Sequence, residues 1–194
     1  AKAGAAIVHC HVREPDTGER RQEWGTITEN ALRIDPTDAE AIVNALSIDH
    51  AGSFNLFYLL RKHYWTAEGA EQEDVADFLE DAYKRVRDIN DDLAIRIVEL
   101  GGIPPNTPPT IQEQAEVRLE AEDRYDLRAS LEGDLEGYAT LIVGMRDHID
   151  LTEEKGDRGT AELLRDHLED LEADAHELEQ FLEDDTLVRA EVVR

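Results

Sequence analysis

The stretch EDVADFLEDAYKRVRDINDDLAIRIVELGG, residues 73–102, decides the fold class. Its apolar residues recur at spacings of three and four, so they share one face of an amphipathic helix from Glu73 to Leu100. That face consists of Val75, Leu79, Ala82, Val86, Ile89, Leu93 and Ile97. Gly101 and Gly102 end the helix, because glycine readily adopts the left-handed conformation that closes a last turn. A long helix with one apolar stripe needs other elements to cover it.

Three further segments have the same periodicity. The first begins with Asp35 as N-cap and Pro36 in the first turn and runs to Trp65, and the others span about residues 123–151 and 157–183. The stripe of the first is Val43, Leu46, His50, Phe54, Phe57, Arg61 and Tyr64. The stripe of the second of these is Leu127, Leu131, Leu135, Tyr138, Ile142, Met145 and Ile149. The stripe of the last is Ala161, Leu164, Leu168, Leu171, Ala175, Leu178 and Leu182.

The connection between the second and third helices is long. Residues 103–121 hold four of the six prolines and a short helical patch, TIQEQAEV, at residues 110–117. The other two connections are short, and each helix would be about 40 Å long at 1.5 Å per residue. This layout predicts an all-α, ferritin-like four-helix bundle with a long crossover between helices two and three.

The composition restricts the function. The 194 residues include 46 acidic and 20 basic side chains, for a net charge of −26, and 41% are hydrophobic. A chain of this kind can bury a core, and its charge disfavours a basic nucleic-acid reader. We interpret the acidity as adaptation to molar salt, where screening shortens the Debye length to about 3 Å; an acidic interaction surface is the alternative. The sequence shows no apolar run of about 18 residues, no secretory layout and one cysteine, Cys10, which favours a cytoplasmic protein.

The chain changes character near Ile34. Residues 1–34 carry five acidic and five basic side chains, so residues 35–194 hold the whole net charge. The segment AGAAIVHCHV, residues 3–12, is typical of a short buried strand, and PDTG at residues 15–18 is typical of a turn. We therefore expect a tail over residues 1–34, a helical domain over 35–188 and a second tail over 189–194.

Several motifs resemble the Dps family of mini-ferritins, and haloarchaeal members in particular. They are RKHYWTAEGAEQEDVADFLEDA at residues 61–82, DDLAIRIVELGGIPPNTP at 91–108, YDLRASLEGDLEGY at 125–138 and LEADAHELEQFLEDDTLV at 171–188. The resemblance covers residues 35–188. It implies a homo-oligomeric shell of twelve subunits that oxidises ferrous iron, stores the mineral inside and, in some members, protects or binds DNA.

The same resemblance implies a ferroxidase site, with a histidine before a tryptophan, a second histidine twelve residues later, and three acids further on. Those positions hold Tyr64, Ala76, Glu80, Asp91 and Ile95 here, so three of five ligands are substituted. Glu80 and Asp91 stand about 16 Å apart on one helix, so only an antiparallel second copy could bring them to one metal. Two interpretations are open: Glu80 and Asp91 form a remnant metal site together with Tyr64 or His63, or they are two solvated carboxylates.

Other metal-ligating residues are sparse. Glu172 and His176 lie one turn apart on the last helix and form a second candidate metal pair, with plain surface solvation as the alternative. The chain has no Glu-x-x-His motif, the signature of di-metal sites inside a bundle. His148 and His167 are isolated at this level, and His50 on the apolar stripe is typical of a core histidine.

The segment AGAAIVHCHVREPDTG, residues 3–18, resembles the zinc-binding strand of the beta-keto acid cleavage enzymes. As a strand it would place His9 and His11 on one face and Cys10 on the other. The resemblance covers only residues 1–18, so it implies a fusion remnant, a misassigned start or a tail reused for contacts.

These observations predict a shell subunit for iron sequestration and oxidative-stress protection whose ferroxidase centre is degenerate. Clustered acids such as Glu169, Asp170, Glu172 and Asp174 could carry iron without a dedicated site. The alternative is a non-catalytic structural subunit that co-assembles with a competent Dps paralogue. DNA binding is not expected, because the chain has no lysine-rich arm and Arg13, Arg20 and Arg21 lie beside acids.

Overall fold

The computed structural model describes residues 12–13, 20–21, 32–68 and 72–183. Near the N-terminus, β1 (Val12–Arg13) pairs antiparallel with β2 (Arg20–Arg21). The predicted PDTG turn and the residues His9, Cys10 and His11 lie outside the described residues. The other elements of the described structure are helices, as the periodicity predicts.

The first helix pair follows the predicted start and stop signals. Helix α2 spans Pro36–Thr66, and the Asp35 carboxylate caps it by accepting a hydrogen bond of 2.9 Å from the Thr37 backbone N–H. Helix α3 spans Gln72–Glu99, and Gly101 follows it with φ of 88°, the left-handed conformation expected there.

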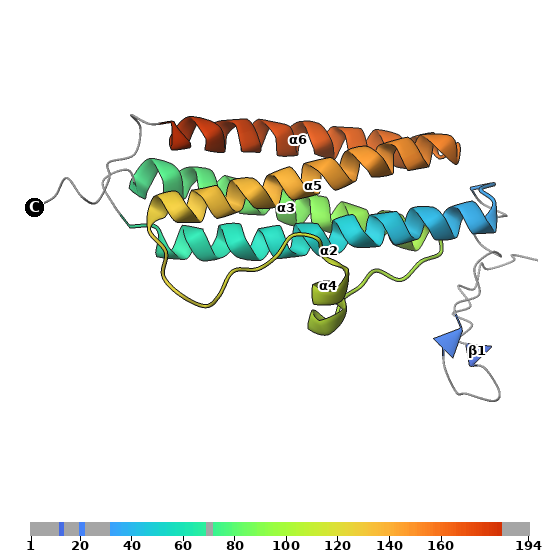
Figure 1. The fold of residues 1–194 in the computed structure, drawn as a ribbon. Helices are drawn as coiled ribbons and strands as arrows, with labels where there is room; N and C mark the ends of the chain where they lie inside the picture. The colour runs from blue at the N-terminus through green and yellow to red at the C-terminus, as the bar shows by residue number, and fades with distance from the viewer. Residues whose placement is uncertain (1–11, 14–19, 22–31, 69–71, 184–194) are drawn as a thin grey trace, which may run out of the picture.

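The second pair begins after a long crossover. Helix α4 (Pro108–Gln114) interrupts this connection and packs against α2, on the outer side of the bundle in Figure 1. Helix α5 spans Leu127–Glu154 and α6 spans Arg158–Leu182. The carboxylate of Asp126 caps α5, so this helix begins about four residues later than predicted.

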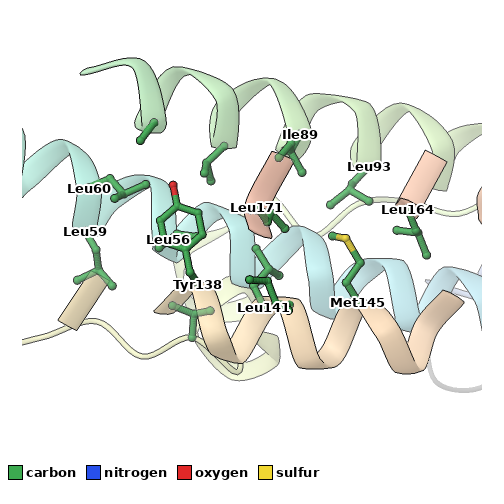
Figure 2. Close-up of a cluster of buried hydrophobic side chains, with 14 of the residues drawn as sticks. Leu56, Leu59, Leu60, Ile89, Leu93, Tyr138, Leu141, Met145, Leu164 and Leu171 are labelled. Atoms are coloured by element: carbon green, nitrogen blue, oxygen red, sulfur yellow. The ribbon is translucent and has the colours of Figure 1, made fainter. Parts of the chain in front are cut away.

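The four long helices form the predicted bundle. Contacts join α2 to α3, α5 to α6, α2 to α5 and α3 to α6, and the four run side by side in Figure 1. The core lies between them, where Figure 2 shows Tyr138, Leu141 and Met145 of α5 facing leucines of the other three helices. Tyr138 is the largest fully buried side chain.

One predicted stripe is partly wrong. Near the C-terminal end of α2 the buried residues include Leu56, Leu59, Leu60 and His63, whereas the predicted Arg61 and Tyr64 are only half-buried. The segment FNLFYLLRKHYW, residues 54–65, carries apolar residues on every face, so periodicity does not choose among them. The aromatic residues instead fill the seam between α2 and α3, where the rings of Phe57 and Tyr64 both contact Tyr83.

Across the described residues, no helix combines the length and the apolar character that a membrane crossing requires.

Candidate functional site

The five positions of the expected ferroxidase centre lie on α2 and α3. The ring of Tyr64 packs against Tyr83, with centroids 5.6 Å apart, and Glu80 accepts a 2.7 Å hydrogen bond from the Lys84 ammonium. Asp91 is exposed on the same helix as Glu80, eleven residues away. A single copy therefore does not bring Glu80 and Asp91 together.

These residues do not fit a dedicated iron centre. Iron in proteins needs several oxygen or nitrogen donors, and the side chains of Ala76 and Ile95 offer none. Ile95 is a hydrophobic side chain that is 58% exposed, at a position where the resemblance implies a carboxylate. Within the described part of the chain, no group of three or more His, Cys, Asp or Glu side chains is arranged to hold a metal ion.

The second candidate pair, Glu172 and His176, lines an open groove of about 530 Å³ between α5 and α6. The Arg146 guanidinium lies 2.6 Å from a Glu172 oxygen, so this carboxylate already has a cationic partner. His176 is exposed, and its Nε2 lies 2.9 Å from the side-chain nitrogen of Gln180. The guanidinium competes with any cation for Glu172.

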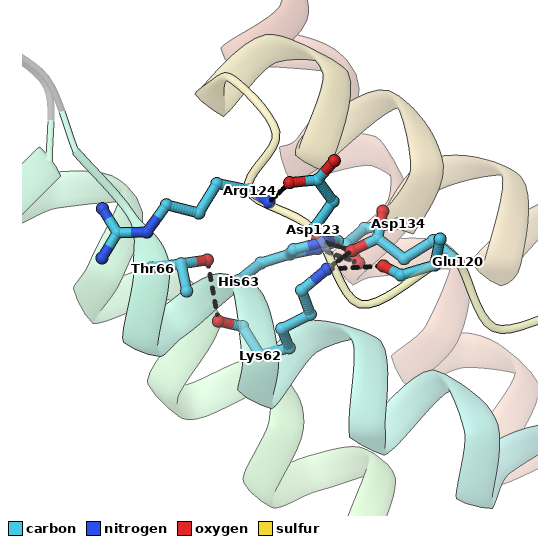
Figure 3. Close-up of polar contacts among 8 residues, drawn as sticks. Lys62, His63, Thr66, Glu120, Asp123, Arg124 and Asp134 are labelled. Carbon is cyan, nitrogen blue, oxygen red and sulfur yellow. Dashed lines mark hydrogen bonds and ion pairs between the residues drawn. The ribbon is translucent and has the colours of Figure 1, made fainter.

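A buried group of polar side chains centres on His63. Its Nδ1 lies 2.8 Å from both carboxylate oxygens of Asp134, and its Nε2 lies 2.8 Å from Glu120. Lys62 forms an ion pair with the same Glu120. Figure 3 shows His63 reaching from α2 between Asp134 of α5 and Glu120 of the crossover.

This arrangement favours a charged imidazole. Burial disfavours the charge on His63, but the hydrogen bonds and charges of Asp134 and Glu120 outweigh burial and raise the pKa of His63. With both carboxylates ionised, both ring nitrogens donate, which only the imidazolium form can do. The two carboxylates lie at opposite nitrogens of one ring, so the three groups cannot converge on a metal ion. Their role is to fasten the crossover to α2 and α5.

A second histidine pair joins the same two helices. His148 Nδ1 of α5 lies 2.9 Å from an oxygen of Asp49, which is buried on α2. Burial opposes charge on His148, but the hydrogen bond to Asp49 and the negative charges of Asp49, Glu116 and Asp147 together outweigh burial and raise the pKa of His148. His148 is therefore not isolated, as the sequence suggested, but paired with a buried carboxylate.

The remaining buried histidines are neutral. His50 contacts two backbone carbonyls, of Asn90 at 3.1 Å and of Pro105 at 3.0 Å, as a core histidine does. Burial lowers the pKa of His50 and of His167. The Nε2 of His167 makes no hydrogen bond, and its nearest carboxylate, Asp92, lies 3.6 Å away.

A third buried polar group crosses the core between α5 and α6. The Tyr138 hydroxyl donates a 3.0 Å hydrogen bond to Asp174, and Arg85 of α3 pairs with the same carboxylate. Asp174 is buried with these two partners, so it does not belong to an exposed acidic cluster with Glu169 and Asp170, as the sequence suggested.

Sequence reasoning did not single out Asp49, Asp134 or Glu120. A signal for two of them exists, because Asp49 and Asp134 each follow a core leucine by three residues, at Leu46 and Leu131. A carboxylate on an apolar stripe must find a buried partner, which here is a histidine. For Glu120, in an irregular segment, periodicity offers no such signal.

Comparison with known proteins identifies the same family by sequence and by structure. The model of the ferritin-like domain family matches residues 43–188. A protein of Halobacterium salinarum named "DNA protection during starvation protein" is 45% identical over 159 residues, which cover 82% of this chain and 87% of that protein.

Solved structures have the same fold. The crystal structure of an archaeal Dps homologue from Halobacterium salinarum superposes with a TM-score of 0.81 at 42% identity, covering 91% of this chain and 99% of that one. A Dps protein from Vibrio cholerae, described as a member of a superfamily of ferritin-like diiron-carboxylate proteins, gives a TM-score of 0.76 at 25% identity, covering 82% and 99%.

A separate short match concerns an unrelated enzyme. A segment of 44 residues is 46% identical to a 3-dehydrocarnitine:acetyl-CoA trimethylamine transferase of Rhizobium meliloti, and it covers only 15% of that enzyme. A match of this extent does not provide the enzyme's fold.

Proposed function

The chain belongs to the ferritin-like domain family and, within it, to the Dps proteins, and from this premise we propose that it is a shell subunit that sequesters iron and protects against oxidative stress without a ferroxidase centre of its own. The shell would be a homo-oligomer of twelve copies. The absence of a ferroxidase centre is inferred from the residues at positions 64, 76, 80, 91 and 95, because two of those side chains, Ala76 and Ile95, cannot bind metal.

Iron in this proposal is cargo held by exposed carboxylates. Helix α6 carries eight acidic residues against two basic ones, and most of the acids are exposed. Hydrated ferrous ions are attracted to such a surface, and carboxylate oxygens suit a hard cation. Dissolved oxygen or peroxide would be the oxidant, and each ferrous ion would lose one electron to it. Without converging ligands this oxidation should be slow.

The two remnant carboxylates, Glu80 and Asp91, would contribute at most a weak cation contact between subunits. Lys84 competes for Glu80 at 2.7 Å, as Arg146 competes for Glu172. Glu172 and His176 would likewise act as part of the acidic surface and not as a site of defined geometry.

Oxidation of ferrous iron in multimolar salt tests the proposal. The absorbance of ferric species is followed for buffer, for the native chain and for the variant Tyr64→His, Ala76→His, Ile95→Glu. We expect the native rate to lie close to that of buffer, the variant to exceed it, and native shells to retain ferric iron on a sizing column. Iron-free shells after loading would exclude iron storage.

The missing donors also favour a second candidate function, a structural subunit that co-assembles with a competent Dps paralogue. Purification of the tagged chain in native salt distinguishes the two. Recovery of complete shells of this chain alone would exclude co-assembly, whereas mixed shells that load iron only with the paralogue would support it.

A further inference from the structure

His167 on α6 is a buried polar side chain whose outer ring nitrogen has no hydrogen-bond partner. The residue is 7% exposed and lies on the apolar stripe of its helix, three residues after Leu164 and four before Leu171. Within the described part of the chain, the Nε2 atom makes no hydrogen bond. Because nearly all buried polar atoms are satisfied, an atom of this kind indicates a ligand that a single protein chain does not supply.

The group that faces this nitrogen is a carboxylate from the neighbouring helix. Asp92 on α3 places an oxygen 3.6 Å from His167 Nε2, and α3 and α6 lie side by side (Figure 1). This separation exceeds the hydrogen-bond range of about 2.7–3.2 Å. Burial lowers the pKa of His167, which favours the neutral ring. With the ring proton on Nδ1, a nitrogen lone pair and a carboxylate oxygen face each other, and both are electron-pair donors.

The separation of the two atoms suits two ligands of one metal ion. Histidine nitrogen and carboxylate oxygen bind zinc at about 2.0–2.2 Å, so two such ligands of a tetrahedral ion stand about 3.4 Å apart. The 3.6 Å between His167 Nε2 and the Asp92 oxygen is close to that value. An imidazole nitrogen suits iron and zinc, whereas magnesium and calcium prefer sites made of oxygen alone.

Asp92 is also available to a cation. Its side chain is 53% exposed, so solvent and ions reach it from outside the bundle. In the described structure no lysine or arginine forms an ion pair with Asp92, whereas Glu80 and Glu172 each pair with a basic side chain. The exposed carboxylates of Asp166 and Asp170, on the same helix as His167, add negative charge near the imidazole. The local field therefore attracts a cation to the unpartnered nitrogen.

We propose that His167 Nε2 and Asp92 together bind one divalent ion of the iron-to-zinc series between α3 and α6, with water completing its coordination. The site holds a single ion, so it does not replace a ferroxidase centre, which pairs two. The inference goes beyond the proposed function and does not require it, because binding of one ion needs neither storage nor oxidation.

Equilibrium dialysis against Co²⁺ tests the site. The chain is stripped with chelator, freed of the chelator and dialysed in multimolar salt with excess Mg²⁺, which competes for sites made of carboxylates alone. The variants are His167→Gln and Asp92→Asn. The matched control is Asp88→Asn, which removes an exposed carboxylate one turn earlier on α3. Circular dichroism checks that every variant is helical, and Asp92→Asn, at the surface, provides the test even if His167→Gln does not fold.

We expect the native chain to retain one Co²⁺ per subunit in excess Mg²⁺. The dissociation constant should rise about tenfold or more for His167→Gln and Asp92→Asn and stay within about twofold for Asp88→Asn, since only the first two lose a ligand. A native chain that retains no Co²⁺ would overturn the inference, as would equal retention by Asp92→Asn and Asp88→Asn. Native shells that bind Co²⁺ in this way but hold no ferric iron after loading would count against the proposed function alone. Shells that store iron but show no Co²⁺ site would count against this inference alone.

Discussion

The Nδ1 atom of His63 lies 2.8 Å from both carboxylate oxygens of Asp134, and the two side chains are 1% and 0% exposed. Seventy-one residues separate them in the sequence. The pair joins α2 to α5 within the bundle, and Glu120 at the opposite ring nitrogen adds the crossover. The imidazole of His63 therefore holds α2, α5 and the crossover together.

Removing the carboxylate of this pair should destabilise the fold. Asp134→Ala leaves His63 buried with one partner fewer, and breaking a buried ion pair costs about 3–5 kcal/mol. Chemical denaturation at fixed protein concentration and salt measures the change. The control is Glu68→Ala, which removes an exposed ion pair with Arg124 and should cost at most about 1 kcal/mol. Equal effects of the two substitutions would contradict the assigned role of Asp134.

Stability should also depend on pH through His63. The pKa of His63 is raised in the folded state, so its contribution is fully present below the unfolded value of about 6.5 and is lost as pH rises through the folded pKa. The pKa values of His50 and His167 are lowered in the folded state, so these residues make stability rise with pH. The pKa of His148 is raised, so His148, like His63, makes stability fall as pH rises.

The informative quantity is therefore the difference between the native chain and His63→Gln. We expect the melting temperature of the native chain to exceed that of His63→Gln by a larger margin at about pH 6 than at about pH 9. A margin that is constant over this range would show that folding does not raise the pKa of His63.

Gly102, just after α3, is packed too closely to tolerate a side chain. A Cβ atom at this position would lie 2.7 Å from Val43 Cγ1 and 2.8 Å from Ile97 Cγ2. Gly102→Ala should cost about 1–3 kcal/mol by overpacking. Gly133→Ala is the matched control, because nothing lies within 4 Å of its added Cβ and alanine favours helix α5. Thermal denaturation should shift in opposite directions for the two; a common direction would disprove this explanation.

The chain should not bind duplex DNA directly, although a relative is named for DNA protection. DNA binding requires basic groups that release counterions, and 16 arginines and four lysines stand here against 46 acids. We expect no shift of linear DNA in an electrophoretic assay at about 0.1 M salt, where electrostatic binding is strong. A complex that forms at low salt and dissociates as salt rises would reveal a basic surface that the net charge conceals.

Much of the fold was predictable because its signals are local. Asp35 caps α2 as predicted, α6 begins close to the predicted position after Asp157, and Gly101 adopts a positive φ after α3. The start of α5 was harder to predict from the sequence, since both Asp123 and Asp126 are good N-caps and only the structure shows that Asp126 is used.

The polar groups of the core were harder to predict because they join distant residues. The sequence marks Asp134 as a carboxylate on an apolar stripe, but its partner depends on how α2 and α5 pack. The stripe of α2 was misplaced near Tyr64 for a related reason, since only α3 decides which aromatic side chains fill the seam. The division of the chain at Ile34 and the roles of Glu80, Asp91, Glu172 and His176 remain predictions.

The uneven distribution of acids between α2 and α6 gives each subunit an electric dipole moment across the bundle. In molar salt that moment is screened over about 3 Å, but at 0.1 M the Debye length grows to about 10 Å, which is longer than the 5.4 Å pitch of a helix. Successive turns of α6 then repel one another, while the nearly neutral α2 does not change. Desalting should therefore loosen the molecule from α6 inward and leave the helix that holds His63 intact longest.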